Sequence, residues 1–337
     1  MKHGIAFAGN LLADNVKKID VWPEQGMLCN IRKIAPGVGG LVPNTCGSLA
    51  LVDPSVPLYA IGLIGNDENG RFIRQRLTSL GIDVSGIRVL EGGTTSFTDV
   101  MTVAGTGERT FFHSRGTNAL FGPEHIDLDR MTADILHLGY AMLLDRFDAD
   151  DPEYGTVMAR VLHDAQARGI RTSMDVVSDA SGRFDRVVTP SLRYCNYIIL
   201  NEVEASLVTH IPVRRADDSL DEDAVGRICG KMLDLGVQES VTIHAPEGGW
   251  CMTADRVLHS ARSLRLPEDF IKGKVGAGDA FCAGMLYGIY QEWTPEKSLR
   301  FGCCTAAACM SAPDSLSGVR SAAECWALEE KFGHRQA

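Results

Sequence analysis

The chain has 337 residues, of which 45% are hydrophobic and 23% are charged, so it can bury a substantial core in one large domain or two smaller ones. That composition excludes a disordered chain and a coiled coil. Its 33 Lys and Arg residues against 43 Asp and Glu residues give a formal net charge of −10. This acidity argues against a nucleic-acid partner, because nucleic-acid-binding proteins usually present a basic surface.

The sequence also predicts a cytoplasmic protein with no membrane partner. The longest uncharged stretch, residues 34–52, contains Pro36 and Pro43 and several glycines, which a bilayer helix tolerates poorly. The first nine residues are not expected to form a signal peptide, because their short apolar run is soon followed by Asn10 and Asp14. The 10 cysteines form no C-x-x-C pair and are expected to be buried, reduced thiols. The histidines have no metal-ligand spacing, so the sequence gives little support for a zinc site.

Short apolar runs alternate with amphipathic stretches along most of the chain. Apolar runs predict buried strands at residues 4–9, 58–64, 135–139, 170–177, 197–200 and 240–244. Helical spacing predicts helices at 69–80 and 152–167, ended by Gly81 and Gly169. Strands that alternate with helices indicate an α/β fold, doubly wound, with a mostly parallel sheet covered by helices on both faces.

Two segments interrupt this alternation. Residues 27–34 and 94–115 look like antiparallel strands, the second with a hairpin turn at 105–107. We expect strands inserted at about 12–36 and 92–116 to form a small β-sheet lid over one end of the main sheet; ordinary edge strands are the alternative. After residue 278 the chain is predicted to be helical, with a helix start at Thr294-Pro295. Without an internal repeat or low-complexity linker, residues 1–337 are predicted to form a single domain.

The segment with the clearest chemistry reads Gly-Ala-Gly-Asp-Ala-Phe-Cys-Ala-Gly over residues 276–284. Its glycines allow a tight turn into a helix, whose first backbone N–H groups and dipole attract an anion such as a phosphate. Asp279 would lie in the first turn, where a carboxylate can accept a proton from a hydroxyl that attacks phosphorus. The alternative is an Asp that only interacts favourably with the helix dipole.

This segment is similar to the signature near the C-terminus of the PfkB, or ribokinase-like, family of carbohydrate kinases. Further segments resemble family motifs in the same order along residues 4–320. They are Gly-Asn-Leu-Leu-Ala-Asp (9–14), Gly-Gly-Leu-Val-Pro-Asn (39–44), Ile-Gly-Asn-Asp-Glu-Asn-Gly (64–70), Gly-Glu-Arg-Thr (107–110) and Asn-Glu-Val-Glu (201–204).

The resemblance implies an ATP-dependent transfer of the γ-phosphoryl group to a hydroxyl of a small carbohydrate or sugar acid, on a ribokinase-like fold whose lid sheets often pair between two subunits. It implies that Asp279 is the general base and that the backbone amides of Gly276, Ala277, Gly278 and Asp279 form an anion hole. It implies that Asn201 and Glu204 hold Mg²⁺. It also implies that Asp14 and Asn44 bind substrate hydroxyls and that the backbone at Gly39 and Gly40 approaches the substrate closely. Asn44 as a helix cap and Glu204 as a solvated carboxylate are the structural alternatives.

Three places in the sequence differ from the family pattern or add to it. The family often has residues that help to bind a monovalent cation where this chain has Gly273, Lys274 and Val275. Our hypothesis is that the Lys274 ammonium replaces the cation beside the nucleotide; the alternative is a Lys that faces solvent. The nucleotide loop keeps Thr242 and Gly248 but has His244 where Gly is usual. Arg115 follows the lid hairpin and is a candidate to bind an acidic group of the substrate.

Other classes of protein fit less well. A dehydrogenase needs G-x-G-x-x-G and a P-loop NTPase needs G-x-x-x-x-G-K-[ST], and the sequence has neither. A nucleoside kinase of the same fold and a non-catalytic sugar-binding protein stay open as alternatives.

Overall fold

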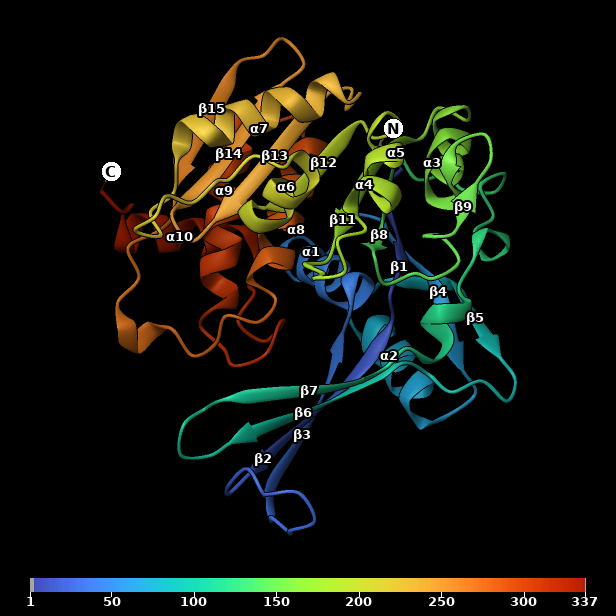
Figure 1. Cartoon of the computed structure of the whole chain (residues 1–337), viewed down its shortest axis with the longest axis vertical. Helices are drawn as coiled ribbons and strands as arrows, with labels where there is room; N and C mark the ends of the chain where they lie inside the picture. Colours follow the sequence, from blue (N-terminus) through green and yellow to red (C-terminus); the bar gives the residue numbers. More distant parts are fainter. Residues whose placement is uncertain (1–2, 337) are drawn as a thin grey trace.

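The structure is a computed structural model that describes residues 3–336, and a nine-stranded sheet forms its centre (Figure 1). Neighbouring strands are parallel except in the pairs β13–β14 and β14–β15, which are antiparallel. In spatial order the strands are β15 (Leu258–Arg262), β14 (Gly248–Thr253), β13 (Ser240–Ala245), β12 (Tyr197–Asn201), β11 (Arg171–Val176), β8 (Ile135–Ala141), β1 (Ile5–Gly9), β4 (Leu58–Gly65) and β5 (Asp83–Leu90).

Helices cover both faces of this sheet, as the sequence pattern predicts. Alternation along β1 sends Ile5 and Phe7 into one hydrophobic core and Ala6 and Ala8 into the other. The first core includes side chains of α1 (Gly47–Val52), α2 (Glu68–Ser79), α8 (Ala277–Tyr290), α9 (Pro295–Cys309) and α10 (Ala322–Phe332). The second includes side chains of α3 (Val157–Gln166), α4 (Phe184–Val187), α5 (Thr189–Leu192), α6 (Glu202–Thr209) and α7 (Glu222–Asp234).

A separate four-stranded sheet, here called the lid sheet, extends away from the body (Figure 1). Its order is β3 (Ile31–Gly39), β2 (Leu12–Ile19), β6 (Phe97–Val103) and β7 (Arg109–Ser114). The predicted hairpin is confirmed by β6 and β7. Both segments expected to be antiparallel strands pair in that way, β3 with β2 and β7 with β6, and the two hairpins join through the parallel pair of β2 and β6. The predicted strand at 27–34 begins later, at Ile31.

The predicted helix at 152–167 also begins later than expected. Residues 150–156 form a small hairpin of β9 (Asp150–Asp151) and β10 (Gly155–Thr156), and α3 starts only at Val157. Thr156 is the N-cap, with a side-chain oxygen that accepts a hydrogen bond from the Ala159 amide at 3.1 Å. The helix starts at 69–80 and at Thr294-Pro295 are confirmed by α2 and α9. Within residues 3–336 no helix is both long and apolar enough to cross a bilayer.

Candidate active site

The N-terminus of α8 depends on Gly276, which has a positive φ of 77°. A Cβ at this position would lie 2.4 Å from the Cβ of Ser315, so both the backbone conformation and the space require glycine. The turn places Asp279 in the first turn of the helix. The Ala277 amide donates to the Lys274 carbonyl at 3.3 Å. The backbone amide of Ala277, one of the four expected to form the anion hole, is therefore already hydrogen-bonded in this structure.

The carboxylate of Asp279 accepts hydrogen bonds from three side chains that lie far from it in the sequence. The Asn44 amide donates to Oδ2 at 3.1 Å, and the Thr45 hydroxyl donates to Oδ1 at 3.3 Å. The Tyr140 hydroxyl, from the end of β8, also donates to Oδ1. Asn44 is fixed in turn by Ser315, whose hydroxyl donates to Asn44 Oδ1 at 2.7 Å. Asn44 thus positions Asp279 and is not the helix cap considered as an alternative.

Burial dominates the electrostatics of Asp279. Burial raises the pKa of its carboxyl group to about 6, and the hydrogen bonds from Tyr140, Asn44 and Thr45 oppose that rise. A carboxyl group with this pKa is largely ionised at neutral pH, yet it is more basic than an ordinary Asp. These are the properties of a group that accepts a proton from an alcohol during catalysis.

The predicted substrate residues lie where the lid sheet joins the body. Asp14 on β2 lies beside Gly39 on β3, where a Cβ would come within 2.3 Å of Asp14 Oδ2. Burial raises the pKa of Asp14 to about 6. Gly40 has a φ of 89°, and its carbonyl accepts a hydrogen bond from the backbone amide of Asn44 at 3.0 Å. Residues 39–44 therefore connect the neighbourhood of Asp14 to the Asn44–Asp279 pair.

Asn201 and Glu204, the predicted magnesium residues, form a capping box at the start of α6. The Glu204 amide donates to Asn201 Oδ1 at 2.8 Å, and the Asn201 amide donates to Glu204 Oε2 at 3.1 Å. Glu204 is only 5% exposed, so the alternative of a solvated carboxylate is wrong. Burial raises its pKa to about 7 against the opposing effect of these hydrogen bonds, and Asp279 adds to the rise through charge repulsion.

Asp175 is a buried carboxyl group near this site that the sequence analysis did not identify. It lies at the end of β11 and is 9% exposed. Its pKa is well above the usual range because it is buried and because Glu204 and Asp279 repel its charge. Three carboxyl groups within electrostatic reach of one another are a set of hard oxygen donors that suits Mg²⁺. Tyr140, Thr45 and Ser315 were also missed, since none belongs to a motif with a recognisable spacing.

The predicted nucleotide residues differ in how they are placed. Thr242 is 1% exposed within β13, so its side chain has almost no surface to offer a ligand. A Cβ on Gly248 would lie 2.3 Å from the Ala261 carbonyl oxygen, so packing of the sheet edge already requires glycine there. Lys274 is exposed in the loop before α8.

His244 lies against the start of α8. A Cβ on Gly278 would come within 3.1 Å of the His244 ring, which also packs on Phe281 with ring centroids 5.0 Å apart. Burial lowers the pKa of His244 to about 4, so the imidazole is neutral. The ring therefore lies beside the predicted anion site without adding positive charge to it.

Arg115 lies at the end of β7, where its guanidinium forms an ion pair with Asp145. Both side chains are partly exposed, Arg115 by 38% and Asp145 by 48%. Hydrogen bonds from Ser181 lower the pKa of Asp179, and charge attraction from Arg183 and Arg115 adds to this effect. The same two arginines oppose the burial that raises the pKa of Asp148 to about 6. Both guanidinium groups thus act on carboxylates of the loops that follow β8 and β11.

A half-buried carboxylate in the first turn of a helix that starts at a glycine, in a chain with a doubly wound sheet and a lid sheet, is typical of a phosphotransferase of the sugar-kinase class. The family described as "pfkB family carbohydrate kinase" matches residues 14–321. The chain belongs to the PfkB family of carbohydrate kinases, and the expectation of an ATP-dependent kinase with an alcohol acceptor is confirmed at that level.

One named sequence relative agrees with this assignment, and two solved structures share the fold. The chain is 26% identical over 318 residues to an "ATP-dependent ribose-1-phosphate kinase" from Halopiger xanaduensis, covering 94% of this chain and 93% of that protein. Arabidopsis thaliana ribokinase complexed with ribose and ATP superposes with a TM-score of 0.79 at 20% identity, over 97% of this chain and 99% of that one. Burkholderia thailandensis nucleoside kinase in complex with inosine gives 0.73 at 17% identity, over 99% and 100%.

Proposed function

We propose that this protein transfers the γ-phosphoryl group of ATP to a hydroxyl group of a small carbohydrate that carries an acidic substituent. The observation that carries the reaction type is Asp279, a half-buried carboxylate in the first turn of α8, oriented by Asn44, Thr45 and Tyr140. This arrangement fixes a base of raised pKa beside helix amides that can bind an anion.

In the proposed mechanism Asp279 accepts the proton of the acceptor hydroxyl as its oxygen attacks the γ-phosphorus. The bond between that phosphorus and the bridging oxygen breaks, and ADP leaves with the electron pair. The Gly278 and Asp279 amides, which have no partner within the helix at its first turn, would stabilise negative charge on the transferred group. Asp14 and the backbone at Gly39 would hold the sugar so that one hydroxyl faces Asp279.

Asn201 and Glu204 would hold Mg²⁺, with Asp175 as a further carboxylate within reach. The donor set fits the ion, because carboxylate and amide oxygens are its preferred protein ligands and Glu204 is buried without a basic partner among the groups that shift its pKa. When bound, Mg²⁺ neutralises charge on the phosphates of ATP.

Two observations favour an acidic acceptor. Arg115 and Arg183 both act on Asp148 and Asp179 and therefore lie near the same loops, and the exposed Asp145 carboxylate that pairs with Arg115 is a group that an anionic substrate could replace. The relative from Halopiger xanaduensis is named for a sugar phosphate. A nucleoside acceptor is the second candidate, favoured by the similarity in fold to a nucleoside kinase.

The lid sheet would also pair two copies of the chain. Large apolar side chains are exposed on its strands and on the loop between β2 and β3: Ile31, Ile34, Phe111 and Phe112 on the strands, and Trp22 and Leu28 on the loop. Trp22 stacks on Phe112 with ring centroids 6.2 Å apart, whereas Phe111, the preceding residue of β7, faces the opposite side of the sheet. Exposed apolar groups gathered in this way are typical of an association surface, and sedimentation analysis measures whether the chain dimerises.

The test is ADP formation across matched acceptors: neutral pentoses and hexoses, their phosphates and acids, and nucleosides. We expect turnover with a phosphorylated or carboxylated sugar, and a loss of kcat of about 10²–10⁴-fold in Asp279→Asn. Folding of the variant is checked by its melting temperature. Turnover confined to nucleosides selects the second candidate. Binding of a sugar without any turnover, in the wild-type protein with Mg²⁺ and ATP, would show that the kinase proposal is wrong.

A further inference from the structure

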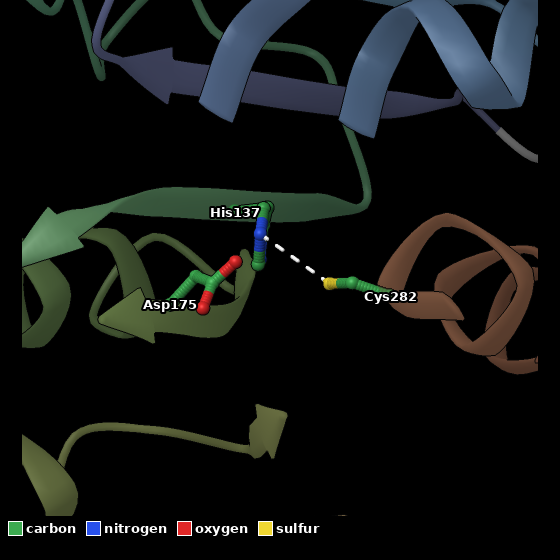
Figure 2. Close-up of side chains that lie close together, drawn as sticks. All are labelled: His137, Asp175 and Cys282. Carbon is green, nitrogen blue, oxygen red and sulfur yellow. Dashed lines mark hydrogen bonds between the residues drawn. The ribbon is translucent and has the colours of Figure 1, made fainter. Parts of the chain in front are cut away.

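Three side chains with metal-ligating atoms lie close together at the interface between α8 and the main sheet. They are His137 on β8, Asp175 on β11 and Cys282 on α8, and Figure 2 shows them directed toward a common point. One ligand atom from each lies within 4.8 Å of the other two. His137 and Cys282 are buried, at 0% and 2% exposure, so the fold and not chance at the surface holds them together.

The distances within the cluster fit a tetrahedral metal ion. His137 Nε2 and Cys282 Sγ are 3.7 Å apart. Zinc bonds of about 2.3 Å to sulfur and about 2.0 Å to nitrogen, at a tetrahedral angle, separate the two ligand atoms by about 3.5 Å. The pair therefore needs almost no movement to accept an ion between its two atoms.

The surroundings orient both ligands for this role. His137 Nδ1 is 3.0 Å from the Ser173 hydroxyl, its partner across the β8–β11 pairing. In the tautomer whose Nδ1–H donates to the Ser173 hydroxyl, the lone pair of Nε2 faces Cys282, as in metal sites whose histidine is held by an outer partner. Asp175 lies two residues after Ser173, on the same face of β11. The charged groups that act on its carboxylate are two further carboxyl groups, those of Glu204 and Asp279.

We propose that His137 Nε2, Cys282 Sγ and a carboxylate oxygen of Asp175 form a site for a thiophilic divalent cation of the Zn²⁺ class, and that its occupation inhibits the kinase. Binding exchanges the Cys282 S–H bond for a sulfur–metal bond and releases the proton to solvent. A nitrogen, sulfur and oxygen donor set selects this class of ion over Mg²⁺, which prefers oxygen ligands.

Inhibition follows from the position of the ligands. Cys282 is three residues after Asp279 on α8, about one helical turn or about 4.5 Å along the axis. A divalent cation there lowers the basicity of Asp279 through charge attraction. It also draws Asp175 away from Glu204, the predicted magnesium residue.

Cobalt binding tests the site directly, because a cobalt–thiolate bond gives a near-ultraviolet charge-transfer absorption. We expect wild-type protein to show this band with one equivalent of Co²⁺, and Cys282→Ser to lose it. Cys304→Ser, which removes a buried thiol on α9, is the matched control and should keep it. Asp175→Asn, nearly identical in size, should bind Co²⁺ at least about tenfold more weakly. This variant also serves if Cys282→Ser does not fold.

Kinase activity gives the second measurement. With Mg²⁺ in excess, Zn²⁺ should inhibit wild type and Cys304→Ser at the same concentration, and Asp175→Asn should need at least about tenfold more for the same fractional inhibition. A charge-transfer band that persists in Cys282→Ser, or Co²⁺ binding and Zn²⁺ inhibition unchanged in Asp175→Asn, would overturn the proposal. Cobalt binding is measured without substrate, so this result is independent of the proposed acceptor.

Discussion

The side-chain amide of Asn44 donates a hydrogen bond of 3.1 Å to the carboxylate of Asp279, across a sequence separation of 235 residues. It joins the helical turn that follows Gly40 to the first turn of α8. Through residues 39–44 the same turn is connected to Asp14 at the base of the lid sheet. The base proposed to take the proton and the residues proposed to hold the sugar are therefore linked through the short segment 39–44.

Tyr140→Phe should change how activity depends on pH. The Tyr140 hydroxyl donates to Asp279 and lowers the pKa of that carboxyl, which burial brings to about 6. Removing the donor raises the pKa of Asp279, so the acidic limb of the kcat–pH profile should move to higher pH. Measurement of kcat between pH 5 and 8 tests this. Tyr154→Phe, which removes a hydroxyl beside His163 and Tyr194, is the control and should leave the limb in place.

Glu204→Gln should weaken the response to magnesium while the start of α6 remains intact. A Gln oxygen can still accept the Asn201 amide and keep the capping box. Loss of the negative charge should raise the Mg²⁺ concentration for half-maximal activity by about tenfold or more. Glu153→Gln, at a 66% exposed side chain, provides the comparison. An unchanged Mg²⁺ requirement would remove Glu204 from the proposed metal site.

Arg115→Ala should raise KM for an acidic acceptor by about tenfold or more, because a charge-assisted contact is lost. KM for a neutral sugar of the same size should change little. The control is Arg130→Ala, at an 89% exposed side chain that pairs weakly with Asp127. Equal effects on acidic and neutral acceptors would mean that Arg115 acts only through its ion pair with Asp145.

Potassium tests the substitution at Lys274. If the ammonium replaces a monovalent cation beside the nucleotide, wild-type activity should respond little to K⁺, whereas Lys274→Met should have lower activity that K⁺ partly restores. The assay compares K⁺ with tetramethylammonium at constant ionic strength, so that screening is the same in both series. Strong activation of the wild-type protein by K⁺ would contradict the hypothesis.

The helix and strand pattern was predictable wherever the signal is local. The helix at 69–80 and the start at Thr294-Pro295 were predicted within a residue, because capping residues and apolar spacing act over one or two turns. The start of α3 was predicted too early. The sequence of residues 152–156 is compatible with a helix, but in the structure these residues belong to the hairpin of β9 and β10. The parallel pairing of β2 with β6 could not be predicted from strand patterns that contain no partner information. The single-domain assignment stays a prediction.

Sequence alone identified the glycine-bounded turn at residues 276–279 and its acid, because a helix start and its first-turn carboxylate are set by neighbouring residues. It also identified Asn44 and Glu204 through the family resemblance. Tertiary structure alone brought Tyr140 to Asp279 and placed His137, Asp175 and Cys282 in one cluster. These contacts join strands and a helix that are distant in the chain. Burial, which sets the pKa values of the site, likewise exists only once the sheet and α8 have packed together.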